Sequence, residues 1–273
     1  MALANKTVAS PAAFPSFPNV KNEKNAPGLN LMVFGPPGVG KTSFLATIKD
    51  AQPDDKILLF DIDVGRESVL DVDIDFALPP SYLAAVADGT STEGISKKLT
   101  WQELRGYLDT ALALKGSSPY RTYAFDSLSS IYYELLIPFV VGSETKKVEW
   151  PHYFEAQRVL TKFLRDAKSL SEYGINTLFT GHVKEENDGD ITNTRLALPQ
   201  GIRNEVLLIV NHVGYLERKV EKGTPTETRV LHMAPPKRVD GPKIRQTRSG
   251  KQAPLVYEDP SLGILLQAIK ESQ

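Results

Sequence analysis

The chain has 273 residues, of which 41% are hydrophobic, enough for the core of one large α/β domain or two small ones. Its formal net charge of −1 excludes a global basic field for nucleic acid, so any DNA contact must come from a local patch. The absence of cysteine excludes a disulfide framework and cysteine-ligated zinc, and no apolar run reaches the roughly 18–20 residues of a membrane span. We therefore expect a protein of the cytoplasm, with no signal peptide at residues 1–6 and no membrane partner.

The first 28 residues are rich in Pro, Asn, Ala and Lys, which predicts a flexible N-terminal arm. Phe14 and Phe17 are its notable residues. The arm is either a disordered tail or a peptide that docks these aromatic rings on a neighbouring subunit. Residues 29–273 show no internal repeat and no linker, so we expect them to form one domain.

A glycine-rich stretch at residues 35–42 matches the P-loop pattern G-x-x-x-x-G-K-[ST]. It follows the apolar run 31–34, which predicts a buried strand, and precedes a helix that begins near residue 43. Glycines let backbone N–H groups converge on phosphates, and the lysine supplies positive charge to the β- and γ-phosphates. The predicted nucleotide-binding residues are Gly35, Pro36, Pro37, Gly38, Val39, Gly40, Lys41, Thr42 and Ser43.

Three later apolar runs end in polar residues, as strands of a parallel sheet do when their carboxyl ends face a site. The run 56–61 ends at Asp61 and Asp63, the run 121–125 ends at Asp126, and the run 176–181 ends at His182. Asp126 is the expected Walker B residue, which would hold Mg²⁺ together with the hydroxyl of Thr42.

Helices are expected over residues 101–116, 128–140, 153–173 and 261–269, because apolar residues there recur at helical spacing. Residues 205–213 favour a helix or a strand, and the strand 215–219 is expected to pair with 229–233. Residues 141–152 and 183–203 are polar, which predicts loops, the second long and mobile. Strands that alternate with helices predict a mostly parallel central sheet, with helices on both faces and antiparallel strands near the C-terminus.

The acidic residues narrow the class of P-loop protein. Ser127 follows Asp126, where AAA+ ATPases and large helicases place a glutamate, and no N-K-x-D stretch for guanine occurs. The chain resembles the RecA-type ATPase core in Asp61-Ile62-Asp63, Asp126-Ser127-Leu128 and Thr180-Gly181-His182.

That resemblance implies that Asp63 activates the attacking water and that His182 senses the γ-phosphate, both acting with Lys41 in catalysis. Asp63 stands where the family has glutamate, so hydrolysis should be slow or should depend on DNA or a partner. The bland alternatives are a strand-end cap for Asp63 and a structural hydrogen bond for His182.

A closer resemblance is to phage-encoded ATP-binding proteins with a RecA-like core, which include minimal single-strand annealing proteins. Residues 101–108, 181–186 and 205–207 carry this resemblance, which extends over about residues 28–270. It implies binding of ATP and Mg²⁺, single-stranded DNA as substrate in recombination or annealing, and a homo-oligomer in the host cytoplasm. It also allows a single-strand-binding protein as partner.

Two segments compete as the DNA surface. Residues 183–203 mix basic and acidic side chains, whereas residues 237–251 hold six basic residues and one acid. The basic run could be a solvated hairpin, could contact DNA phosphates, or could reach the γ-phosphate of a neighbouring subunit. Its cations are Lys237, Arg238, Lys243, Arg245, Arg248 and Lys251.

A second function stays open, in which ATP shapes an oligomeric assembly that has no DNA substrate. A small-molecule kinase is a weaker alternative, because no arginine-bearing lid beside an acceptor pocket can be placed.

Overall fold

An eight-stranded sheet forms the centre of the computed structural model, which describes residues 27–142, 147–188, 191–220, 227–236, 239–240, 242 and 254–271. The strand order is β10-β9-β8-β1-β5-β4-β2-β3, and the six strands from β8 to β3 run parallel. Strand β9 is antiparallel to β8, and β10 is antiparallel to β9. The strands are β1 (Asn30–Phe34), β2 (Ile57–Asp61), β3 (Asp75–Phe76), β4 (Thr122–Asp126), β5 (Asn176–Gly181), β8 (His212–Val220), β9 (Glu227–His232) and β10 (Val256–Glu258).

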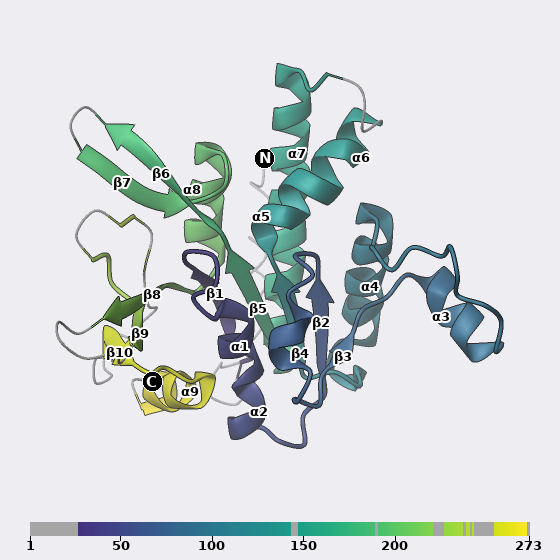
Figure 1. Ribbon diagram of the computed structural model, residues 1–273, viewed down its shortest axis with the longest axis horizontal. Helices are drawn as coiled ribbons and strands as arrows, with labels where there is room; N and C mark the ends of the chain where they lie inside the picture. The colour runs from purple at the N-terminus through teal and green to yellow at the C-terminus, as the bar shows by residue number, and fades with distance from the viewer. Residues whose placement is uncertain are drawn as a thin grey trace, which may run out of the picture.

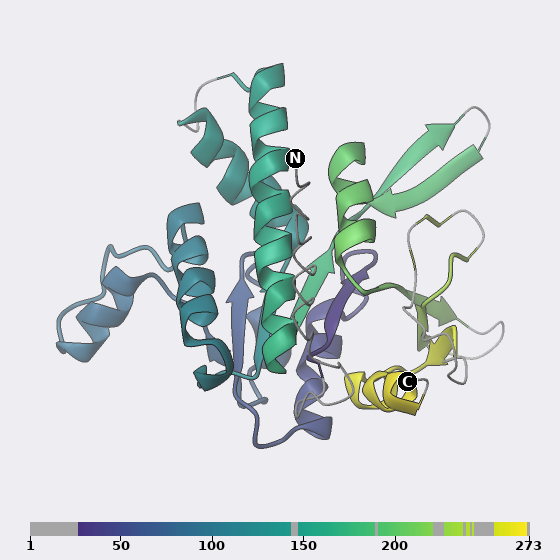
Figure 2. The same ribbon diagram turned by 180° about the vertical axis from the view of Figure 1, so that it is seen from behind.

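Helices cover both faces of this sheet (Figures 1 and 2). The α-helices are α1 (Lys41–Ala46), α2 (Ile48–Ala51), α3 (Pro80–Ala87), α4 (Trp101–Leu114), α5 (Leu128–Ser130), α6 (Ile137–Val141), α7 (Trp150–Ser169), α8 (Gln200–Ile209) and α9 (Leu262–Glu271). Short helical segments are η2 (Arg66–Val69), η3 (Lys115–Ser117), η4 (Ile131–Leu136) and η5 (Leu170–Tyr173). The predicted mostly parallel α/β architecture with antiparallel C-terminal strands is confirmed. Among the described residues, none of the helices combines the length and apolarity that crossing a bilayer requires.

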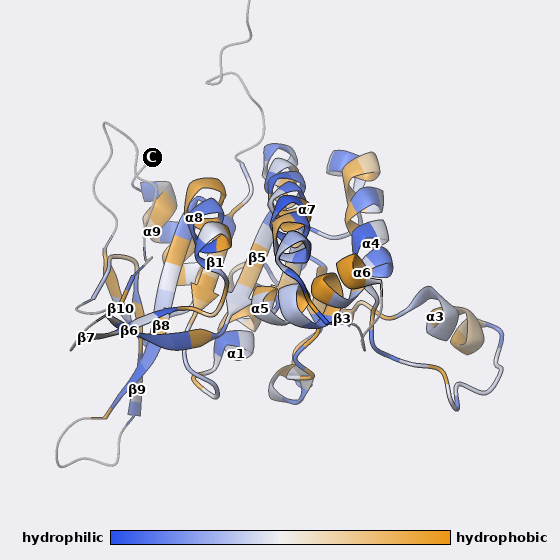
Figure 3. Cartoon of the chain, turned by 90° about the horizontal axis from the view of Figure 1, so that it is seen from above, coloured by the Kyte–Doolittle hydropathy of each residue, from blue (hydrophilic) through white to orange (hydrophobic). Residues whose placement is uncertain are grey.

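Strand β1 shows how the sequence divides the core into two layers. Its side chains alternate between the faces: Leu31 and Val33 pack with α1, α2 and α9, whereas Met32 and Phe34 pack with the layer of α4 to α8. All five β1 residues are buried, as expected for a strand covered on both faces. Figure 3 shows orange, hydrophobic segments on central strands such as β5.

The carboxyl ends of β1, β2, β4 and β5 lie at one edge of the sheet, because the four strands are parallel neighbours. Register places Phe34 beside Gly181 and Asp61 beside Asp126. The P-loop and the three polar strand ends predicted from sequence therefore meet at this edge.

The prediction of a long mobile loop at residues 183–203 is wrong. The chain forms a hairpin there, with β6 (Val183–Asp188) antiparallel to β7 (Ile191–Leu196), and α8 begins at Gln200. The hairpin is a separate two-stranded sheet that projects from the body (Figure 1). Val183 and Leu196, at the open end of the hairpin, pack against the core, whereas most strand residues beyond them are polar, a composition that is also typical of a loop.

A cluster of ion pairs around Glu186 joins the hairpin to α8. Glu186 of β6 lies 2.7 Å from the nitrogen of Lys184 and 2.7 Å from Arg195 of β7, and Arg203 of α8 binds it at 2.8 Å. These pairs join the two strands to α8. They also pair Lys184, Arg195 and Arg203, the basic residues for which residues 183–203 were considered as a DNA surface, with a carboxylate.

Two boundaries differ from expectation, and two elements were not expected. Helix α7 begins at Trp150, inside the predicted loop 141–152, because Glu149 and His152 form a capping box and Pro151 suits a first turn. Residues 205–213 are split between α8 and β8. Helix α3 and strand β10 were not predicted.

Two predicted segments lie outside the described residues. The first is the N-terminal arm up to residue 26, with Phe14 and Phe17. The second is the set of basic side chains Lys237, Arg238, Lys243, Arg245, Arg248 and Lys251.

Candidate functional site

The P-loop connects β1 to α1 in a conformation that its glycines make possible. A Cβ at Gly35 would lie 2.2 Å from the carbonyl oxygen of Leu216 on β8, so only glycine fits there. Gly40, which caps α1, has φ of 92°, a backbone conformation that side chains disfavour. The loop thus turns tightly against β8 and keeps its backbone open to a ligand.

Lys41 is the cation at the centre of this loop. Its side chain is 7% exposed, and Nζ donates hydrogen bonds to the carbonyls of Gly35 at 3.1 Å and Pro36 at 3.0 Å. Burial lowers the pKa of Lys41 below its ordinary value, while Asp126 and Asp63 act in the opposite direction. A charged lysine with two neutral carbonyl partners is suited to exchange them for phosphate oxygens.

Asp126 lies at the end of β4 and is almost fully buried, with 2% exposed. Thr42 donates a hydrogen bond to its Oδ2 at 2.5 Å, and Thr180 of β5 donates to its Oδ1. Burial raises the pKa of Asp126, the two threonines oppose this, and the nearby Asp63 and Asp61 raise it further. The peptide bond between Asp126 and Ser127 is cis.

Asp63 and His182 form one pair rather than two separate groups. His182 Nε2 lies 2.8 Å from Asp63 Oδ2, and Ser127 donates to Asp63 Oδ1 at 3.2 Å. Burial alone would raise the pKa of Asp63, but hydrogen bonds from His182, Ser130 and Ser127 outweigh it and lower the pKa. Asp63 is therefore ionised at neutral pH, as a general base must be.

One cleft of about 390 Å³ brings these groups together. It is lined by the P-loop and by residues of four other segments. The lining residues are Pro37, Gly38, Gly40, Lys41, Thr42, Ser43, Asp63, Gly65, Ser68, Asp126, His182 and Arg218. Every catalytic and metal residue predicted from sequence lines this cleft. The volume falls within the range of small-molecule sites, about 300–1,000 Å³.

The oxygen atoms of Thr42 and Asp126 fit a Mg²⁺ ion. Magnesium takes hard oxygen ligands and usually keeps few of them from protein, since phosphates and water supply the rest. A hydroxyl and a carboxylate already 2.5 Å apart at the mouth of a P-loop provide such a pair.

A scan against family models matches residues 28–245 to a family described as AAA domain. The chain belongs to the AAA domain family. The search of curated proteins finds no match for this AAA domain.

Two solved structures resemble this AAA domain at low identity. One is the RadB recombinase, with 16% identity and a TM-score of 0.38 over 80% of this chain and 86% of that chain. The other is the flagellar accessory protein FlaH from Methanocaldococcus jannaschii, with 13% identity and a TM-score of 0.39 over 81% and 83%. In the sheet of the AAA domain, β5 lies between the P-loop strand β1 and the Asp126 strand β4.

The sequence analysis gave no role to Thr180, Gly65 or Arg218. Thr180, next to the last residue of β5, donates a hydrogen bond to Asp126, although the strand-end role was given to His182. Gly65 donates its N–H to Asp61 Oδ1 at 2.8 Å and so fixes the loop after β2. Arg218 reaches the cleft from β8. This strand pairs with β1, and no local sequence pattern predicts that pairing.

Proposed function

We propose that this protein binds ATP with Mg²⁺, hydrolyses it slowly, and couples the nucleotide to single-stranded DNA. The observation that carries the nucleotide part is the single cleft in which the P-loop meets Asp126 and the Asp63–His182 pair. Membership of a P-loop NTPase family supports it. Lys41 would leave the carbonyls of Gly35 and Pro36 for the β- and γ-phosphates.

Thr42 and Asp126 would hold Mg²⁺, which supplies charge neutralisation to the phosphates. Asp63 would accept a proton from the attacking water. Because His182 now binds Asp63, a γ-phosphate that competes for the imidazole N–H would free the carboxylate for water. Sensor and base would then respond to the γ-phosphate together.

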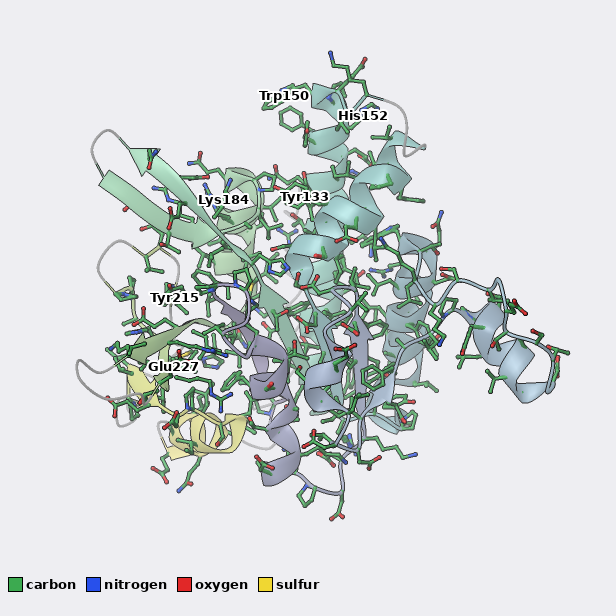
Figure 4. The ribbon with its side chains drawn as sticks, in the orientation of Figure 1. Tyr133, Trp150, His152, Lys184, Tyr215 and Glu227 are labelled. Carbon is green, nitrogen blue, oxygen red and sulfur yellow. The ribbon has the colours of Figure 1, made fainter. Side chains whose placement is uncertain are left out.

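The DNA part rests on exposed aromatic rings at the start of α7. Trp150 is 73% exposed and Phe154 60%, and with Tyr153 they line a groove of about 350 Å³ that Pro199 and Gly201 close on the α8 side. Figure 4 shows Trp150 and His152 at this end of α7, with Tyr133 and Lys184 nearer the sheet. Exposed rings on which bases stack bind single strands without sequence preference, at about 1–3 kcal/mol per base.

Intrinsic fluorescence tests the binding of single-stranded DNA, and ATP turnover with nucleotide affinity tests the nucleotide site of the same protein. The chain has two tryptophans, of which Trp101 is buried at 5% exposed, so quenching by an oligo(dT) strand reports on Trp150. We expect quenching that Trp150→Phe abolishes, and an ATPase rate that rises with the same strand. Lys41→Ala should lower MgATP affinity about 100-fold, since hydrogen bonds to charged groups contribute about 1.5–3 kcal/mol. Lys162→Ala, on the exposed side of α7, should not.

Other outcomes separate the alternatives. If oligo(dT) neither quenches Trp150 nor stimulates turnover, while ATP changes the size of the protein in solution, the nucleotide-gated assembly is correct and DNA is not the substrate. If Lys41→Ala keeps the affinity of the wild type, the nucleotide site itself is wrong.

A further inference from the structure

Two arginines of the β8–β9 hairpin lie against the P-loop of the same chain. Arg218 of β8 and Arg229 of β9 are directly opposite in the strand register. Arg218 Nη2 donates to the carbonyl of Gly38 at 2.5 Å. A Cβ built on Gly40 would lie 3.3 Å from Arg229 Nη1, so this guanidinium covers the next glycine of the loop.

The positive charges of Arg218 and Arg229 contribute little to the stability of the fold. Like charges directly opposite each other on antiparallel strands are destabilising. Glu227 of β9 lies 3.1 Å from Arg218 Nη1, but the two side chains are 52% and 49% exposed, and such surface pairs contribute little. Figure 4 shows Glu227 and Tyr215 in the part of the molecule that β8 and β9 form.

Arg218 binds a neutral carbonyl oxygen of the P-loop, which is a weaker partner for a guanidinium than a phosphate would be. A guanidinium forms its strongest bonds as a fork on two anionic oxygens, whereas the Gly38 carbonyl is neutral and offers one oxygen. Arg218 also lines the same cleft as Lys41, Asp63 and His182. Under the proposed function, Lys41 would bind the β- and γ-phosphates, and the Asp63–His182 pair would lie at the γ-phosphate end.

We propose that Arg218 binds the γ-phosphate of ATP in its own subunit, leaving the Gly38 carbonyl when ATP enters and returning to it when ADP remains. Arg229 is a positioning residue, which holds Arg218 toward the cleft by packing on Gly40 and by repulsion across the strand pair. The proposal rests on the proposed binding of ATP at the P-loop. It gives the β8–β9 hairpin a direct contact that distinguishes ATP from ADP.

The test compares affinities for MgADP and for a non-hydrolysable ATP analogue by calorimetry. In Arg218→Ala we expect the analogue to bind about 10- to 100-fold more weakly, with ADP affinity unchanged. Arg218→Lys should recover part of the loss, since it keeps the charge without the fork. Lys219→Ala is the matched control, because Lys219 is the next residue on β8 and its nitrogen lies 3.8 Å from Glu217. It should bind both nucleotides like the wild type.

Three results would overturn the proposal. An equal loss for ADP and the analogue in both Arg218 variants would mean that Arg218 only shapes the loop through Gly38. No loss for either nucleotide would reduce Arg218 to the exposed pair with Glu227. If the wild type binds neither nucleotide, the P-loop assignment fails first and this proposal fails with it. Unfolding curves that match the wild type would show that the alanine variant is folded.

Discussion

Two charge clusters, one at the P-loop and one around Glu186 of the β6–β7 hairpin, use similar residues in opposite ways. At the P-loop, burial lowers the pKa of Lys41 and raises that of Asp126, so the environment disfavours the charged form of each. At the hairpin, hydrogen bonds from Arg203 and Lys184 hold the pKa of Glu186 well below its usual range. The hairpin cluster satisfies its own charge, whereas the P-loop cluster gains from a ligand.

The difference teaches that a perturbed pKa does not by itself mark a functional site. The pKa of Glu186 is strongly lowered, yet three cations surround it and its role is to join β6, β7 and α8. Asp126 and Lys41 are buried beside an open cleft, with neutral hydroxyls and carbonyls as partners. Burial with replaceable partners, rather than shift alone, marks the site.

The largest effect should come from removing the base of the P-loop cluster. Asp63→Asn keeps the shape and removes the proton acceptor, so ATP turnover should fall about 10²–10⁴-fold, the usual contribution of general-base catalysis. MgATP affinity should stay near that of the wild type. Single-turnover kinetics with calorimetry measure both, and Asp61→Asn at the end of β2 is a comparison. Wild-type turnover in Asp63→Asn would place the base elsewhere.

A smaller effect should follow from breaking the Asp63–His182 pair. Because His182 lowers the pKa of Asp63, His182→Ala should raise that pKa and shift the acid limb of the kcat/KM profile to higher pH. The same pair should affect stability. Because the pKa of Asp63 is lower in the folded protein, its ionisation stabilises the fold at pH values above the ordinary pKa of 3.8, and this stabilisation is lost as the pH falls through the folded-state pKa. An unmoved acid limb would show that Asp63 does not control the rate.

The hairpin cluster should show a structural effect alone. Glu186→Gln removes the charge that three cations share, which should cost about 1 kcal/mol because the group is partly exposed to solvent. Faster amide exchange should be confined to β6, β7 and the start of α8. The exposed neighbour Glu185→Gln is the control. A loss of nucleotide affinity in Glu186→Gln would remove the distinction between the two clusters.

The core and the P-loop were predictable because they follow from local patterns. Leu31 to Phe34 form a continuous apolar run before a specific phosphate-binding motif, and Asp126 ends another such run. Thr100 and Glu103 likewise form the capping box that their spacing predicts.

What could not be predicted depends on contacts between distant segments. The β6–β7 hairpin exists because Glu186 meets Arg203 of α8, and no periodicity within residues 183–196 shows this. The approach of Arg218 to Gly38 joins residues 180 positions apart. The Asp63–His182 pair required the register of β2, β4 and β5, which sequence alone does not supply.

Thermal unfolding of Asp126→Asn, with and without Mg²⁺ and ATP, tests the contrast between the clusters most directly. Asp126 has a raised folded pKa, so the wild type loses stability as pH rises above 3.8, and the neutral amide can still bond both threonines. We predict that at pH 7 the variant is more stable without ligand, by about 0.5–1 kcal/mol, and that Mg²⁺ with ATP stabilises it less than the wild type. A variant that is less stable without ligand, yet gains as much from Mg²⁺ and ATP, would contradict the account.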